Sequence, residues 1–269
     1  MSYNTSLGML IDDVVYEQII EYMADVDISR RIFPTDFRNE GDSIKIVKEG
    51  TWPDALEVAE GAEVPIYQPD YVEITEIYKK IGYRTQITHE MITDERWDMV
   101  QRAARKAGQQ LGLKMSIDVL SEAWGDAGVQ TYTVSGWWGG ANADEIGDLA
   151  SCIGKLTNKN YGYDIVVVNP LNYAQLAAMD EFIHKEKGGD IKKYDVGSIM
   201  GLDVIVTPMI SENNFLMIDR ENAGRLFIRE DLRRATYNEV TRDVEGQVFF
   251  LRYREAVIAP SAIVFATGY

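Results

Sequence analysis

The stretch VAEGAEVPIYQPDYVEITEIYKKIGYRTQITHEMITD, residues 58–94, decides the fold. Within it, residues 71–88 alternate apolar and polar positions and are rich in β-branched and aromatic residues, a pattern that predicts a strand. Residues 43–48 share this pattern, and the twenty residues 49–68 between the two strands carry Gly50, Pro53, Gly61 and Pro65. We therefore expect a long β-hairpin with a functional loop, because loops of this length rarely lack a role in a compact domain.

A single long helix is expected directly after this stretch, over residues 94–124. Apolar residues recur there every three or four positions, no proline interrupts them, and Gly125 follows. Thirty-one residues at 1.5 Å each would make a rod of about 46 Å, far longer than the usual helix. A shorter helix is expected upstream, over residues 12–33, ended by Pro34.

The remainder of the chain predicts a second region of mixed helices and strands. A linker rich in glycine and tryptophan covers residues 128–143. We expect helices over residues 143–158 and 171–187, the latter opened by Pro170. Strands are expected at residues 164–168, 202–207, 214–218, 247–253 and 262–266. The chain is thus of the α+β class.

Composition excludes several classes of protein. The net charge of −16 disfavours specific nucleic-acid binding by the chain as a whole, because affinity for DNA rests on Lys and Arg. The single cysteine, Cys152, rules out a disulfide framework within the chain, and its apolar neighbours predict a buried, unreactive side chain. No apolar run reaches the roughly 18 residues of a membrane helix, and the N-terminus does not resemble a signal peptide.

Signatures of catalysis, cofactor binding and metal binding are missing from the sequence. It contains no GxxxxGK[ST], GxGxxG, GxSxG or HExxH motif. The glycine-rich GWWGG at residues 136–140 lacks the lysine of a phosphate-binding loop. The two histidines, His89 and His184, have no nearby set of ligands. We expect a protein that is not an enzyme and that has no catalytic, metal or cofactor site.

Two elements in the opening stretch resemble the Hong Kong 97 family of viral capsid proteins. EGAEVP, residues 60–65, resembles the element that ends the extended loop of that family, and THEMITD, residues 88–94, resembles the element that leads into its spine helix. DIVVVNPLNYAQL, residues 164–176, and MGLDVIVTPMI, residues 200–210, resemble segments of the family's axial domain. The resemblance covers the chain from about residue 12 onward and rests on the order and spacing of these elements.

The resemblance implies an α+β Hong Kong 97-like capsid fold with a defined layout. It comprises an N-terminal arm (1–33), the start of the peripheral domain (34–48), the extended β-hairpin loop (49–76), the peripheral domain (77–127) with spine helix 94–124, the axial domain (128–243), and closing strands of the peripheral domain (244–269). Since the chain starts at Met1 close to the arm, a separate scaffold or none is expected. Residues 49–76 contain no lysine, so covalent cross-linking through the loop is not expected.

The function implied by this resemblance is that of the major capsid protein of a tailed virus. Such a protein assembles with itself into hexamers and pentamers, in the host cytoplasm, to form the icosahedral shell of the virion around double-stranded DNA. The partners implied besides further copies are a scaffolding protein, a portal and a decoration protein; DNA would be enclosed without specific binding, and no membrane is involved.

Three other classes of protein stay open at this point. An encapsulin, a cellular shell that encloses a cargo enzyme, has the same fold and presents a cargo groove on an N-terminal helix, which residues 12–33 could form. An enzyme would depend on one or two buried polar residues. A tail or decoration protein would lack the long spine helix.

Charge divides the hairpin from the segment that follows it. Residues 49–76 carry eight acids and no base, a charge of −8, whereas residues 77–114 carry eight bases and four acids, or 8 − 4 = +4. In the fold that the chain resembles, the extended loop lies across the neighbouring subunit near its spine helix. The interface residues expected in the loop are Trp52, Asp54, Leu56, Glu57, Glu60 and Glu63. Those expected on the spine and peripheral domain are Arg84, Arg96, Arg102, Arg105 and Lys106.

Overall fold

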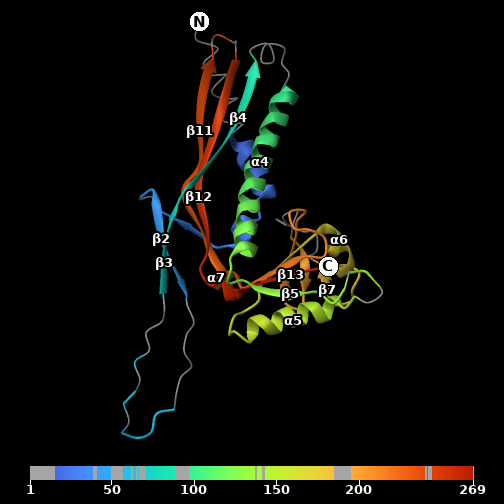
Figure 1. Cartoon of the computed structure of the whole chain (residues 1–269). Helices are drawn as coiled ribbons and strands as arrows, with labels where there is room; N and C mark the ends of the chain where they lie inside the picture. Colours follow the sequence, from blue (N-terminus) through green and yellow to red (C-terminus); the bar gives the residue numbers. More distant parts are fainter. Residues whose placement is uncertain are drawn as a thin grey trace.

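The computed structural model describes most of the chain as three sheets and a long helix (Figure 1). The described residues are 16–38, 41–49, 57–61, 63–64, 66, 71–88, 97–136, 138–140, 143–184, 195–239, 241 and 244–268. No helix among these residues is long and apolar enough to span a membrane.

A four-stranded sheet, here called the long sheet, runs along one side of the molecule (Figure 1). Its order is β1 (Thr35–Phe37), β11 (Gly224–Glu239), β12 (Val244–Val257) and β4 (Lys79–Thr88). Alternation along β12 sends Phe249, Leu251 and Tyr253 into the core and leaves the intervening residues on the other face.

The strand β11 lies in the segment that was assigned from the sequence to the axial domain, and it pairs with β12 over nearly its whole length. The strand itself was not predicted. The physical reason is a β-bulge: the register shifts between Ile228 and Glu230 and again between Glu230 and Arg233, which breaks the alternation that identifies a strand.

The long helix α4 (Trp97–Gly125) lies along the long sheet, and the prediction of a spine helix is confirmed (Figure 1). The predicted first residues, 94–96, lie outside the described residues. A row of buried side chains on α4 that includes Leu111, Met115 and Val119 packs on the sheet. The helix over residues 16–26 and α2 (Ser29–Ile32) pack on α4 from another side.

The second sheet has seven strands and forms the other half of the body (Figure 1). Its order is β5 (Gln130–Thr133), β13 (Ile263–Thr267), β10 (Phe215–Ile218), β6 (Ile165–Val168), β9 (Leu202–Val206), β8 (Asp195–Ile199) and β7 (Phe182–His184). The remaining elements are α5 (Glu145–Thr157), α6 (Pro170–Leu176), α7 (Arg220–Ala223) and the short 3-10 helix η2 (Pro260–Ala262). One hydrophobic cluster joins α4 and the long sheet to this sheet, and a second covers the other side of the seven strands.

Strand β13, which was assigned from the sequence to the closing strands of the peripheral domain, lies between β5 and β10 in the seven-stranded sheet. One expectation is wrong in this half. The helix expected over residues 171–187 ends at Leu176, and β7 follows it. The buried ring of Phe182 packs edge-on against Tyr173, and β7 pairs with β8, so long-range pairing prevails over the local helical pattern. Residues 185–187 lie outside the described residues.

The third sheet is the predicted hairpin, whose strands are β2 (Ser43–Glu49) and β3 (Tyr71–Ile77). Figure 1 shows it extending from the body on the side away from the seven-stranded sheet. The single strand expected over residues 71–88 is instead two strands. Tyr78 separates them: its side chain is buried, and its backbone N–H donates to Asp42 O at 3.3 Å. β3 and β4 belong to different sheets.

Candidate assembly interface

The loop between β2 and β3, where it is described, exposes both acidic and apolar side chains. Glu57, Glu60 and Glu63 are exposed, as expected from the sequence. Val64 and Ile66 leave 67 % and 89 % of their surface in solvent. Such apolar side chains gain free energy when a partner surface covers them. Three further expected residues, Trp52, Asp54 and Leu56, lie outside the described residues.

The turn in this loop has a local cause. Gly61 takes a φ of +81°, a left-handed conformation that side chains disfavour, and nothing lies near the position of a Cβ there. The glycine of EGAEVP therefore permits the turn at residues 60–61.

Two of the expected basic residues have partners within their own chain. The guanidinium of Arg84 lies 4.0 Å from the ring centre of Tyr237 and 3.2 Å from a carboxylate oxygen of Glu239. The guanidinium of Arg105 stacks on Tyr22 at 4.9 Å and donates to its hydroxyl at 3.2 Å. These contacts fix both side chains, and the contact of Arg105 helps hold helix 16–26 against α4.

Two other expected basic residues on α4 are available for a partner. Arg102 and Lys106 are exposed and make no ion pair with the described residues of their own chain. They are one helical turn apart, so they lie on one face of α4. Arg96 lies outside the described residues.

Sequence reasoning missed a basic and aromatic surface on the long sheet, on the face that points away from α4. The pairing register places Lys80, Arg252 and Glu230 in one row, and Gly82, Phe250 and Arg233 in the row two residues along. Lys80 Nζ lies 4.1 Å and the Arg233 guanidinium 5.5 Å from the ring centre of Phe250.

The three longest strands of the long sheet carry a net positive charge, in agreement with this basic surface. Strands β4, β11 and β12 together carry nine bases and five acids, a balance of 9 − 5 = +4 in a chain of net −16. Alternation along β4 puts Lys80 and Arg84 on one face, and this signal could have been found in the sequence. Arg233 could not, because β11 was not predicted.

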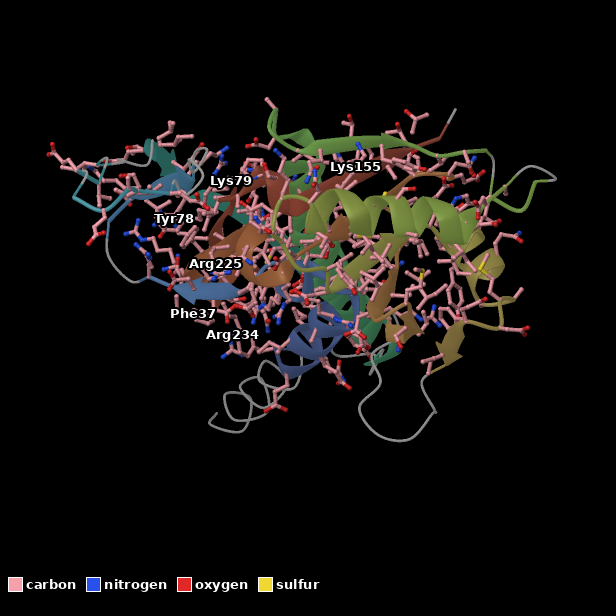
Figure 2. The ribbon with its side chains drawn as sticks, turned by 90° about the horizontal axis from the view of Figure 1, so that it is seen from below. Phe37, Tyr78, Lys79, Lys155, Arg225 and Arg234 are labelled. Atoms are coloured by element: carbon pink, nitrogen blue, oxygen red, sulfur yellow. The ribbon has the colours of Figure 1, made fainter. Side chains whose placement is uncertain are left out.

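The hairpin root is held to the body by a small apolar cluster and several ion pairs. Ile44, Ile46 and Tyr78 pack with side chains of the long sheet. Asp42 accepts from Arg229, and its carboxylate lies 3.5 Å from Arg252, so the pKa of Asp42 is held below its usual value, chiefly by the hydrogen bond from Arg229. Figure 2 shows Tyr78 and Lys79 where the hairpin meets the body, and Phe37 on the neighbouring edge strand.

Reactive chemistry is not a feature of the described residues. No cluster of His, Cys, Asp and Glu among them could hold a metal ion. Cys152 is fully buried on α5, as expected, and burial followed by the charge of Asp148 raises the pKa of its thiol to about 12. A thiol with such a pKa is a poor nucleophile near neutral pH.

Comparison with known proteins identifies the family. Residues 71–264 match the family described as phage capsid protein, and this is most of the chain. The chain belongs to this family. Its role is therefore structural and non-enzymatic, and capsid proteins of this kind assemble into oligomeric shells that form the virion. No curated protein matches the chain.

Solved structures with a similar fold agree with this assignment. A virus-like particle from Pyrococcus furiosus is 16 % identical with a TM-score of 0.68, covering 94 % of this chain and 97 % of that chain. Chains from Microbacterium phage Oxtober96 and Mycobacterium phage Adephagia are 14 % and 16 % identical, with TM-scores of 0.67 and 0.66. They cover 90 % of this chain and 91 % and 90 % of their own. The expected Hong Kong 97-like fold of a tailed-phage major capsid protein is confirmed.

Proposed function

We propose that this major capsid protein forms an icosahedral shell of hexamers and pentamers around double-stranded DNA, with each hairpin loop lying on the next subunit. The observation that carries the proposal is the loop itself. Val64 and Ile66 are exposed at a distance from the body's core, beside Glu60 and Glu63. A solitary subunit gains nothing from such a loop, whereas a neighbouring subunit can cover it.

Charge suggests which surface of the neighbour receives the loop. The hairpin segment 49–76 carries −8. The exposed cations that make no ion pair with the described residues of their own chain are Arg102 and Lys106 on α4 and Lys80 on the long sheet. Each exposed ion pair contributes only about 0.2–1 kcal/mol. A closed shell repeats the contact at every subunit, which makes the sum large.

The two halves of the body correspond in this proposal to the two domains of the fold. The long sheet with α4 would be the peripheral domain, and the seven-stranded sheet would be the axial domain around the symmetry axes. Assembly would take place in the host cytoplasm, with a separate scaffolding protein, portal and decoration protein as further partners. The net charge of −16 favours enclosing DNA without gripping it.

Removing part of the loop tests the proposal. A chain in which a glycine–serine linker of equal length replaces residues 53–62 should fold, because the core lies elsewhere. Circular dichroism should report an unchanged helical signal, while electron microscopy should find free subunits or capsomers in place of closed shells. Normal shells from this variant would contradict the proposal.

The second candidate from the sequence, a cellular nanocompartment that encloses a cargo enzyme, would present its cargo groove on the N-terminal helix. A cavity of about 260 Å³ lies beside the helix over residues 16–26, lined by Tyr16, Ile20 and Met23 and by charged residues that include Arg30 and Asp231. Shells isolated from the natural source distinguish the two, since a virion contains DNA and a nanocompartment contains a folded enzyme.

A further inference from the structure

A row of carboxylates on α4 faces the hairpin root and the long sheet. Asp118 and Glu122 are one helical turn apart and so share one face of α4, and Asp126 follows four residues later, directly after the helix ends. Asp118 accepts from Lys114 Nζ at 2.6 Å and from the Tyr253 hydroxyl at 2.7 Å. Burial and this carboxylate raise the pKa of Tyr253, which keeps its hydroxyl a donor.

Both strands of the hairpin are tied to the body by ion pairs near this row. Lys48, near the end of β2, donates to Asp126 at the end of α4. Glu76, near the end of β3, lies 2.7 Å from the guanidinium of Arg254 on β12. The hairpin is therefore tied to the spine helix by one strand and to the long sheet by the other.

Glu122 is partly buried and lies in the sequence between Asp118, which contacts β12, and Asp126, which contacts β2. The other charges that act on it are those of Arg254 and Glu255 on β12, Lys79 on β4 and Lys48 on β2. Glu255 is only 1 % exposed. Its Oε1 accepts from Lys79, and its Oε2 is buried and has no hydrogen-bond partner among the described residues.

The balance of positive and negative charge in this cluster depends on whether Glu122 carries a proton. The cations are Lys48, Lys79 and Arg254, and the carboxylates are Glu76, Glu122, Asp126 and Glu255. With Glu122 protonated, three cations face three anions. With Glu122 ionised, the cluster has one anion in excess, and two carboxylates repel each other in a partly buried site.

We propose that this cluster is a proton-controlled joint that decides how firmly the hairpin is held to the spine helix and the long sheet. Protonated Glu122 donates its O–H to the unpaired Oε2 of Glu255, and each cation then keeps one carboxylate. Ionised Glu122 competes with Glu76 for Arg254 and with Asp126 for Lys48, which loosens both ties at once. The inference rests on the proposed function in one respect, because the hairpin is taken as the arm that meets the next subunit.

The direction of the pH dependence follows from the environment of Glu122. Burial, followed by the charge of Glu255, raises its pKa above the ordinary value of 4.5, although the neighbouring cations oppose this. An acid whose pKa is raised in the folded form binds its proton more tightly there than in the loosened form. The joint is therefore tight below this pKa and loosens as the pH rises through it.

Hydrogen exchange of free subunits tests the joint without requiring shells to form. After correction for intrinsic exchange, the amides of β2 and β3 should exchange at least about threefold faster at about pH 8 than at about pH 4.5, relative to those of β10. Glu122→Gln should stay slow at both pH values, whereas Glu212→Gln, which removes an exposed charge elsewhere, should behave as the unaltered chain. At about pH 4.5, Asp126→Asn should exchange faster than the unaltered chain, because the tie to Lys48 is lost.

Two outcomes would contradict the proposed joint. One is amide exchange in β2 and β3 that does not depend on pH in the unaltered chain, and the other is the same pH dependence in Glu122→Gln. If Glu122→Gln does not fold, the pH dependence of the unaltered chain and the behaviour of Asp126→Asn still decide the matter. Shell formation is scored separately by electron microscopy. Subunits that show the exchange pattern but never form shells would contradict the proposed function and leave the joint intact.

Discussion

At the scale of single residues, Asp148 shows how a buried charge can serve structure. Its carboxylate is 1 % exposed and accepts from the Tyr132 hydroxyl at 2.9 Å, the Ser135 backbone N–H at 2.9 Å and the Trp138 indole at 3.0 Å. All of these donors are neutral. The carboxylate pins the glycine-rich turn after β5 to α5, a use that no motif in the sequence indicated.

Replacing this carboxylate by an amide should destabilise the fold. In Asp148→Asn the amide NH₂ faces hydrogen-bond donors, so we expect the free energy of unfolding to fall by about 1–3 kcal/mol. Urea denaturation should show a lower midpoint with an unchanged slope. Asp180→Asn is the control, since Asp180 is exposed and the charge change is identical. Equal midpoints for the two variants would refute the role given to Asp148.

The thiol of Cys152 should be inert in the native protein. Its pKa of about 12 leaves little thiolate at pH 8, and its side chain is fully buried. An aromatic disulfide reagent should therefore label Cys152 only as fast as the protein unfolds, and within seconds to minutes in concentrated urea. Rapid labelling of the native subunit would show that α5 opens locally, contrary to this expectation.

At the scale of elements, the crossing of helix 16–26 over α4 depends on two glycines. A Cβ on Gly108 would lie 2.6 Å from the carbonyl oxygen of Ile19, and one on Gly112 would lie 2.8 Å from that of Met23. Real Cβ atoms do not approach backbone oxygens so closely. These glycines let the two helix backbones touch, and Ser116 then accepts a bond from the Ile28 N–H at 3.0 Å.

Alanine at these positions should have the opposite effect from alanine elsewhere in a helix. Gly108→Ala and Gly112→Ala should lower the free energy of unfolding by about 1–3 kcal/mol, because the added methyl group overpacks the crossing. Gly154→Ala on α5 meets nothing within 4 Å and should raise it, by up to about 1 kcal/mol. Thermal or urea denaturation measures both the expected decrease and the expected increase in the free energy of unfolding. A stabilising Gly108→Ala would mean that the crossing is looser than described.

Local patterns predicted some elements well and others badly, for physical reasons. The helix α4, the hairpin and the buried strands β6 and β10 follow from periodicity and from runs of apolar residues. The break at Tyr78 and the strand β7 depend on contacts with residues far along the chain. The register shifts in β11 break its alternation of apolar and polar residues, so the strand was not predicted. Without β11, the basic surface of the long sheet could not be predicted either.

At the scale of the whole molecule, acidic and basic charge are separated. Among the interface residues predicted from the sequence, Glu57, Glu60 and Glu63 are exposed. Charge counting did not distinguish Arg105, which is engaged by Tyr22, from Arg102 and Lys106. Only the fold reveals that one basic side chain is used internally, so the contact between subunits stays a prediction.

Assembly, and not folding of the subunit, should be the salt-sensitive step. Between about 0.05 and 1 M salt the Debye length falls to about 3 Å, which screens exposed pairs. Arg102→Glu with Lys106→Glu should abolish shells, measured by light scattering, while the helical signal stays unchanged. Adding Glu57→Lys and Glu60→Lys should partly restore them. A shell yield indifferent to salt would show that these charges do not drive assembly.

The position of β12 and β13 has a consequence for synthesis. β12 lies between β11 and β4, and β13 lies between β5 and β10, so residues 244–267 complete both large sheets of the body. A nascent chain on the ribosome therefore leaves the inner faces of both sheets open until these residues emerge. β12 also supplies Arg254 and Glu255, so the tie between the hairpin and this strand forms only at that moment. Prematurely terminated chains would lack both completed cores and this tie, and would be left for proteases without entering the growing shell.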